Sequence, residues 1–179
     1  MSTATTWGTT ADERHLPFPC DAVLSSVEAA YYRGITVQAS PAIVFRWLCQ
    51  MRVASYSYGR RSPQELLPGV DELAVGQKVM GVFELIEFER DRSLTLRLKF
   101  KTAESRIYRL FVKEVVESYL TNPQGTGECR LLVKLVVRYR RGPAGWLMRL
   151  LLPLGDLVMT RRQLTNFKRL SEQTARTLS

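Results

Sequence analysis

The sequence predicts an α+β domain in which a curved antiparallel β-sheet wraps around one long C-terminal α-helix, with two short helices after the first strand. Apolar and polar residues alternate over much of the stretch from residue 78 to residue 139, which is typical of strands. The segment 143–179 instead repeats its apolar residues at steps of three and four, as a helix does. Short turns separate the strands, which favours antiparallel pairing, and the twist of such a sheet lets a helix lie across its concave side.

The size and composition indicate one soluble domain. A chain of 179 residues can bury a sizeable core, and its 45% hydrophobic and 24% charged residues are ordinary for a globular protein. We expect an N-terminal arm over residues 1–30, partly disordered, and a single domain over 31–179. The three cysteines have no paired spacing and no apolar signal-like run opens the chain, so we expect reduced thiols and a cytoplasmic location.

The first half of the chain predicts one strand and short helices. A strand is expected at 33–39, where every second residue is apolar. A serine and a proline at 40–41 then start a helix that runs to about residue 52, because serine caps free backbone N–H groups and proline fits the first helical turn. A tyrosine-rich stretch at 55–61 is a second short helix or a loop, and the proline- and glycine-rich residues 62–76 form a long connection. Within the arm, a short helix is expected around 21–30.

Four further strands are expected at 78–90, 94–100, 106–119 and 129–139. Turns at Asp91-Arg92 and at the proline- and glycine-containing stretch before Cys129 separate them. The strand at 94–100 alternates cleanly, which predicts one buried face and one face in water.

The final helical region is expected to be divided at Pro153, which leaves a short amphipathic piece before it and a long helix after it. In the long helix seven residues share one side: Leu157, Thr160, Leu164, Phe167, Ser171, Thr174 and Leu178. Three of them are small and polar, although a helix that closes a dry core more often carries larger apolar residues. The helix therefore either touches a thinner layer or covers a space that it does not fill.

The net charge of +9 is confined to the end of the chain. Residues 1–129 carry fifteen basic and fifteen acidic side chains, whereas 130–179 carry eleven basic and two acidic ones. A basic helix face exposed to solvent explains this charge imbalance. The alternatives are that the basic end of the chain is attracted to an anionic membrane surface or to nucleic acid. Nucleic acid is the less expected partner, because the sequence has no zinc-finger spacing, glycine-rich phosphate loop or RNA-binding aromatic motif. No feature of the sequence indicates an oligomeric state.

Four short motifs occur in a familiar order. Ser40-Pro-Ala-Ile-Val-Phe-Arg-Trp-Leu48 follows the first strand, and Leu73-Ala-Val-Gly-Gln-Lys-Val79 leads into the second. Glu128-Cys-Arg-Leu-Leu-Val133 opens the last strand, with cysteine where threonine is usual, and Asp156-Leu-Val-Met-Thr-Arg-Arg-Gln-Leu164 lies in the closing helix. In these motifs, over residues 33–176, the chain resembles the START/Bet v 1-like superfamily (SRPBCC or helix-grip proteins), in particular its bacterial polyketide cyclase/dehydrase-like members.

The resemblance implies a helix-grip fold, in which the curved sheet holds the final helix around an apolar cavity. It also implies a hydrophobic ligand, because members of the superfamily bind lipids, hormones, polyketides or other hydrophobic molecules. Some members act as cyclases, hydrolases or oxygenase subunits, so the fold leaves the activity open.

The residue types argue against most catalytic devices. The only histidine, His15, lies in the arm, which disfavours a Ser-His-Asp arrangement, and no Cys, His or carboxylate cluster has the spacing of a metal site. We therefore expect no metal and no cofactor. The catalytic option that remains is acid–base chemistry by a buried tyrosine or arginine, and its candidates are Tyr56, Tyr108 and Arg109. A place at the core edge is favoured for the tyrosines, and an outward place for Arg109.

The expected function is binding of a small hydrophobic molecule (a lipid, polyketide or aromatic compound) in a cavity between the sheet and the C-terminal helix. The expected lining is Tyr56, Tyr58, Phe83, Leu85, Leu96, Leu98, Phe100, Tyr108, Val133, Leu135, Val137, Leu157, Thr160 and Leu164. One alternative is a cyclase-like enzyme that uses pocket tyrosine and arginine. Another is a peripheral lipid-handling protein that inserts the apolar residues Trp146, Leu147, Leu150 and Leu151 into a membrane interface, with Arg140, Arg141 and Arg149 at anionic headgroups.

Overall fold

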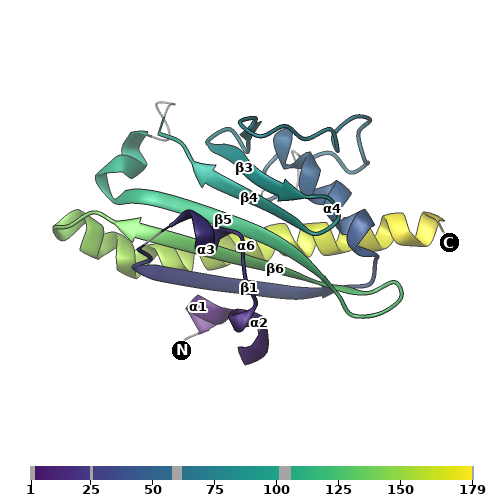
Figure 1. The fold of residues 1–179 in the computed structure, drawn as a ribbon, viewed down its shortest axis with the longest axis horizontal. Coiled ribbons are helices and arrows are strands. Elements are labelled where there is room, and N and C mark those ends of the chain that lie inside the picture. The colour runs from purple at the N-terminus through teal and green to yellow at the C-terminus, as the bar shows by residue number, and fades with distance from the viewer. Residues whose placement is uncertain (1–2, 25, 58–61, 101–105, 179) are drawn as a thin grey trace.

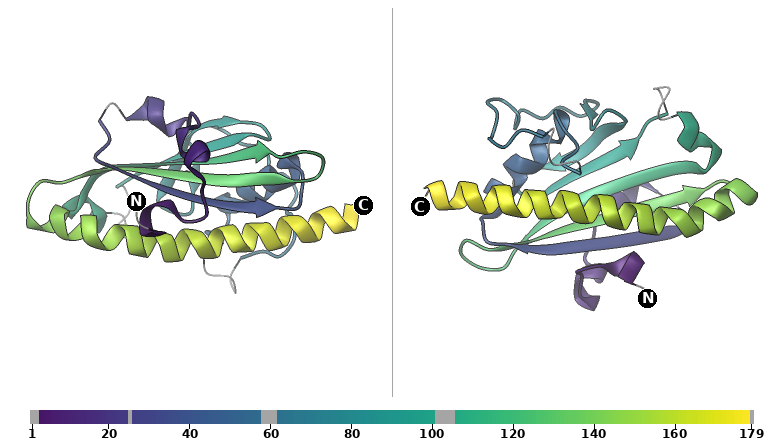
Figure 2. Two further views of the ribbon diagram at one scale, coloured as in Figure 1. Left: turned by 90° about the horizontal axis from the view of Figure 1, so that it is seen from below. Right: turned by 180° about the vertical axis from the view of Figure 1, so that it is seen from behind.

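The computed structural model describes residues 3–24, 26–57, 62–100 and 106–178. Its centre is a six-stranded antiparallel sheet in the order β1-β6-β5-β4-β3-β2 (Figure 1). The strands are β1 (Ala29–Val37), β2 (Lys78–Val79), β3 (Phe83–Glu89), β4 (Ser93–Leu98), β5 (Val112–Pro123) and β6 (Cys129–Tyr139). A single long helix, α6 (Pro143–Leu178), lies across one face of the sheet (Figure 2). The predicted α+β arrangement is confirmed.

Shorter helices surround this frame. They are α1 (Thr3–Thr6), α2 (Ala11–His15), α3 (Cys20–Val23), α4 (Pro41–Cys49), η1 (Gln50–Arg52) and η3 (Ile107–Leu110). The helix predicted around 21–30 is wrong beyond Val23, because β1 already begins at Ala29. The strand predicted from residue 106 is also wrong in its first part, which forms η3. In the tyrosine-rich stretch the described residues 55–57 are not helical.

The predicted break at Pro153 is wrong, because α6 continues through it as one rod (Figure 2). Proline removes one backbone hydrogen bond, and contacts on the inner side hold this part of the helix in place. Met148 and Leu152 pack against the core cluster around Val137. The guanidinium of Arg33 also donates to the Pro153 carbonyl, at 3.3 Å.

The inward side of α6 is largely as predicted, and its small residues are explained by packing. Thr160, Leu164, Phe167 and Ser171 are buried, and Leu157 and Thr174 are half-buried. The Trp47 indole of α4 donates to Thr174 Oγ1 at 3.0 Å. Near the C-terminal end of α6, Thr174 therefore packs against α4.

Leu178 is the exception to the predicted inward side, because it is exposed. The C-terminal end of α6 extends beyond the sheet (Figure 1), and the last of its apolar side chains to pack against the core is that of Ala175.

The face of the sheet opposite α6 is covered by the N-terminal arm. Apolar arm residues pack on the outer sides of β5 and β6, and this cluster consists of Phe18, Cys20, Leu24, Val116, Leu120, Leu132 and Val136. Cys20 N donates to Ser118 Oγ at 2.9 Å, and Ser118 Oγ lies 2.8 Å from the buried Thr95 hydroxyl. The predicted wet face of the strand at 94–100 is therefore wrong at Thr95. The division into an arm of residues 1–30 and a domain of 31–179 stays a prediction.

Candidate functional site

A cluster of polar side chains lies on the inner face of the sheet, where α6 crosses it. We call it the inner polar cluster, and its members are Arg33 of β1, Glu117 and Tyr119 of β5, and Asp156 and Gln163 of α6. In the register of the sheet, Arg33 and Tyr119 are both paired with Val133 of β6, and Glu117 is paired with Leu135. Because residues two apart point to the same side of a strand, Glu117 and Tyr119 share the face that α6 covers.

The ion pair between Arg33 and Asp156 is the charged part of the cluster. Arg33 Nη2 lies 2.7 Å from Asp156 Oδ2, with side chains only 1% and 9% exposed. Burial raises the pKa of Asp156, an effect opposed by the Arg33 charge and by the hydrogen bond from Thr160. Arg33 also donates to the carbonyl of Ala4 at 2.8 Å. Within the described residues its Nε atom has no hydrogen-bond partner.

Glu117 is the acid of the cluster that stays uncharged at neutral pH. Its side chain is buried, with 6% exposure. Its pKa is raised to about 8, chiefly by burial and also by the negative charge of Asp156, while hydrogen bonding to Tyr119 and the charge of Arg33 act in the opposite direction. A protonated carboxyl group can donate one hydrogen bond as well as accept others. Glu117 can therefore bind a carbonyl or hydroxyl group without introducing a net charge.

Tyr119 and Gln163 tie the cluster to neighbouring segments. The Tyr119 hydroxyl donates to Gln163 Oε1 at 2.7 Å, and Gln163 Nε2 donates to the Ser55 carbonyl at 2.5 Å. Burial raises the pKa of Tyr119 well above its usual range, as does the nearby Glu117. Tyr119 is therefore a neutral phenol at neutral pH.

A pair of tyrosines also lies on this inner face. The hydroxyls of Tyr31 and Tyr139 are 2.7 Å apart, within an apolar cluster that includes Val115 and Leu135. Burial raises the pKa of both phenols. The inner face thus offers neutral polar groups set among apolar side chains, which suits a molecule that is mostly apolar.

The predicted lining residues on β3, β4, β6 and α6 come together on this face. They belong to, or pack against, the core clusters beneath α6: Phe83, Leu85, Leu96, Leu98, Phe100, Val133, Leu135, Val137 and Leu164. Thr160 is buried beside Asp156, and Leu157 is half-buried. Their role in lining a ligand site stays a prediction.

The predicted catalytic candidates lie elsewhere. The Tyr56 hydroxyl accepts from Gln50 Nε2 at 2.7 Å, and burial raises its pKa to about 12, so it has a structural partner outside the inner polar cluster. Tyr108 and Arg109 lie in η3 and are exposed, as was favoured for Arg109, and their catalytic or lining role stays a prediction. Tyr58 lies outside the described residues.

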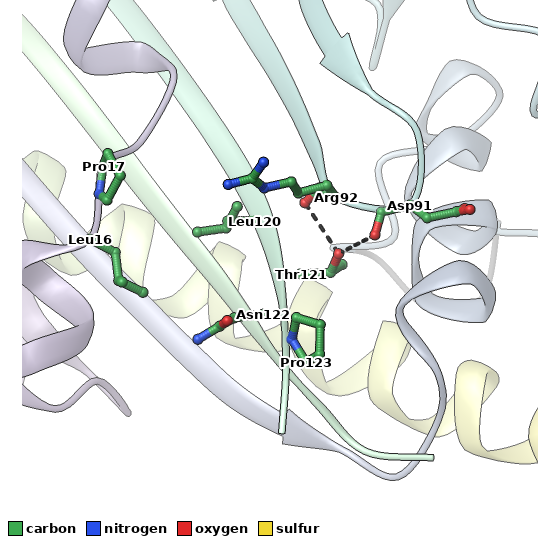
Figure 3. A pocket seen from close by; sticks show the side chains of 8 residues that line it. All are labelled: Leu16, Pro17, Asp91, Arg92, Leu120, Thr121, Asn122 and Pro123. Atoms are coloured by element: carbon green, nitrogen blue, oxygen red, sulfur yellow. Dashed lines mark hydrogen bonds between the residues drawn. The ribbon is translucent and has the colours of Figure 1, made fainter. Parts of the chain in front are cut away.

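An open surface pocket of about 340 Å³ lies next to the arm, on the other face of the sheet (Figure 3). Its lining is Leu16, Pro17, Asp91, Arg92, Leu120, Thr121, Asn122 and Pro123. The Thr121 hydroxyl is already bonded to the carbonyls of Asp91 and Arg92, at 2.7 and 3.2 Å, and the Arg92 guanidinium pairs with Glu89 in solvent. This pocket is a weaker candidate site than the inner polar cluster, because no charged side chain is buried in it.

Metal ligands are not grouped in the described part of the chain: no set of three or more His, Cys, Asp or Glu side chains there could hold a metal ion. The three cysteines are free and buried, and burial raises the pKa of each thiol, to about 11 for Cys20 and Cys129 and about 12 for Cys49. Thiols of this kind are poor nucleophiles. Among the described helices, none is long and apolar enough to span a membrane.

Neither a protein-family model nor a curated protein sequence matches the chain. Solved structures match over most of it. Norcoclaurine synthase of Thalictrum flavum, solved with a transition-state analogue, is 12% identical over 84% of this chain and 98% of its own, with a TM-score of 0.54. A protein of Mesorhizobium loti is 15% identical over 81% of this chain and 98% of its own (TM-score 0.51), and a hypothetical protein of Helicobacter pylori is 14% identical over 87% and 95% (TM-score 0.53).

Identities this low show the fold and nothing finer. The chain has the Bet v 1-like helix-grip fold, with a six-stranded antiparallel sheet and a long C-terminal helix. The fold expected from the sequence motifs is therefore confirmed.

Proposed function

We propose that the protein binds a small hydrophobic molecule between the sheet and α6, with the polar group of that molecule at the inner polar cluster. The observation that supports this most directly is the buried Glu117 carboxyl, whose pKa is raised, beside the buried Arg33–Asp156 pair. Replacing a buried ion pair by apolar residues is often neutral or stabilising. A ligand that uses these groups would give a reason for them to be there.

The chemistry of the cluster favours an uncharged ligand. Arg33 and Asp156 cancel each other, and Glu117 is protonated below a pH of about 8. A ligand carbonyl or hydroxyl can bond to the Glu117 carboxyl and to the unpartnered Nε of Arg33, whereas a strong anion or cation would meet no net opposite charge. Apolar parts of the ligand would gain roughly 25 cal/mol per Å² of buried surface. A lipid, polyketide or aromatic compound with a neutral polar group fits this description.

The first test is native mass spectrometry of protein purified from its host, followed by titration with a panel of apolar and aromatic fluorophores. Saturable binding of one molecule per chain is expected. The variant Glu117→Leu should weaken binding about fivefold, because a buried hydrogen bond contributes about 1 kcal/mol. The matched control Glu87→Gln changes an exposed residue of β3 and should leave binding unchanged. A folded protein that binds none of the panel and retains no molecule would contradict the proposal.

A cyclase-like enzyme is the second candidate. The Glu117 carboxyl supports it, because an acid with a pKa near the working pH can act as a general acid. Chemistry by Tyr108 and Arg109 has less support, since both are exposed on η3. The two candidates differ in the fate of the ligand. A binding protein returns it unchanged after prolonged incubation, whereas an enzyme converts it, and only an enzyme loses turnover without losing affinity in the isosteric variant Glu117→Gln.

A further inference from the structure

The first part of α6 is apolar on the side that faces away from the sheet. Its large exposed hydrophobic side chains, each 46–64% exposed, are Trp146, Leu147, Leu150, Leu151, Leu154, Val158 and Met159. We call this set the outer apolar stripe. The same segment also has an apolar inner side, where Met148 and Leu152 pack against the core. A surface helix normally carries charged and polar residues on its outer side, so the stripe calls for an external partner.

Helix η3 adds apolar surface at the same end of the molecule (Figures 1 and 2). Ile107, Tyr108 and Leu110 are all exposed. The end of η3 is joined to the segment before α6, because the backbone N–H of Arg140 donates to the carbonyl of Phe111 at 2.9 Å. Exposed apolar side chains from two elements are thus gathered at one end of the fold. On most soluble proteins such residues are scattered singly over the surface.

Positive charge flanks the stripe. Arg140 and Arg141 are exposed just before α6, and Arg161 and Arg162 are exposed just after the stripe. Asp156 is the only acidic residue between positions 140 and 171, and it is turned inward against Arg33. Arg149, within the same segment, is instead paired with Glu28 and lies over the Tyr139 ring. The cations available at the surface around the stripe are therefore the four flanking arginines.

We propose that this surface docks on an anionic lipid membrane. The apolar side chains would lie at the boundary between headgroups and acyl chains, as in interfacial amphipathic helices, with the Trp146 ring at headgroup level. The flanking arginines would meet anionic headgroups. A second copy of this chain fits this surface less well than a membrane does, because its own arginines would lie against the arginines of the first copy. The inference is independent of the ligand proposed for the inner polar cluster.

The test is co-sedimentation of the full chain with vesicles of phosphatidylcholine alone or mixed with phosphatidylglycerol. Binding is expected only to the mixed vesicles. High salt should release much of the bound protein, because the Debye length falls to about 3 Å at about 1 M.

Variants test whether the outer apolar stripe and its flanking arginines are responsible for vesicle binding. Leu150→Glu combined with Leu154→Glu should reduce vesicle binding at least tenfold, whereas Val75→Glu, a change at a similarly exposed residue outside the stripe, should not. Arg140→Gln and Arg141→Gln should each weaken binding about fivefold, because a basic residue near an anionic surface contributes about 1 kcal/mol. Thermal melts that match the parent show that each variant is folded.

Three outcomes would overturn the inference. The first is no sedimentation with the mixed vesicles, and the second is equal binding to both vesicle types. The third is a concentration-dependent dimer, seen in sedimentation velocity, that the variant Leu150→Glu dissociates, while neither the parent protein nor the variant binds vesicles. In that case a second copy of the chain covers the stripe.

Discussion

The two parts of α6 differ in where they place their apolar side chains. From residue 160 onward the helix is conventionally amphipathic: Leu164, Phe167 and Leu170 are fully buried, and charged residues face solvent. Before Thr160 the helix is apolar on its inner and its outer side, and the outer side stays exposed. The later part therefore supplies stability, while the earlier part has apolar surface left for a partner. Between them lies Asp156, which joins the inner polar cluster.

The largest effect expected from this comparison is a difference in stability between the two parts. Phe167→Ala should lower the free energy of unfolding by about 3–5 kcal/mol, because its ring is fully buried, 5.1 Å from the ring centre of Tyr56. Leu150→Ala, on the outer apolar stripe, should change it by less than about 0.5 kcal/mol. Urea denaturation measures both. Similar losses would show that the outer stripe is packed in solution.

The junction between the two parts depends on the buried ion pair. Arg33→Met should lower the free energy of unfolding by about 3 kcal/mol, because it leaves the Asp156 carboxylate buried without its counter-charge. The double variant Arg33→Met with Asp156→Leu should recover much of this loss. Equilibrium unfolding of the two single variants and the double variant forms a mutant cycle, and additive losses would argue against a coupled pair.

The pH dependence of stability tests the protonation state of Glu117. Its pKa is raised to about 8 in the folded protein, from an ordinary value of 4.5. Between these values the folded state binds more protons than the unfolded state, so this group makes stability fall as pH rises, by at most about 1.4 kcal/mol per pH unit. Glu117→Gln should remove that slope, and the variant should become the more stable protein toward pH of about 8. Parallel stability profiles for the two proteins would show that Glu117 is ionised in the folded state.

Periodicity predicted the order of the elements, because it is a local signal that each segment carries by itself. The alternation over 129–139 and the inward side of α6 around Leu164 and Phe167 are both found in the structure. The break at Pro153 was predicted from local rules too, and it fails because inner contacts from β1 and the core hold this part of α6. Local rules describe a helix in isolation, and tertiary packing outweighs them here.

The inner polar cluster was missed because its members are far apart in the sequence. Glu117 directly follows the apolar pair Val115-Val116, and Asp156 lies within the run Leu154-Gly155-Asp156-Leu157. A charged residue in such a run was the one local sign of a buried polar group. Which partner it would meet depended on the register of β1, β5 and β6 and on the position of α6, which no local pattern contains.

Ser171 and Thr174 give the smallest expected effect and the sharpest test of how the later part of α6 packs. Within the described residues the buried Ser171 Oγ has no hydrogen-bond partner, whereas Thr174 Oγ1 accepts from the Trp47 indole. Ser171→Ala removes an unsatisfied polar atom and improves helix propensity, so it should raise the free energy of unfolding by about 0.5–1 kcal/mol. Thr174→Ala should lower it by a similar amount, because the indole N–H loses its acceptor. Thermal melts of the two variants should therefore shift in opposite directions, and a loss of stability in both would show that the Ser171 hydroxyl has a partner in solution, such as a buried water.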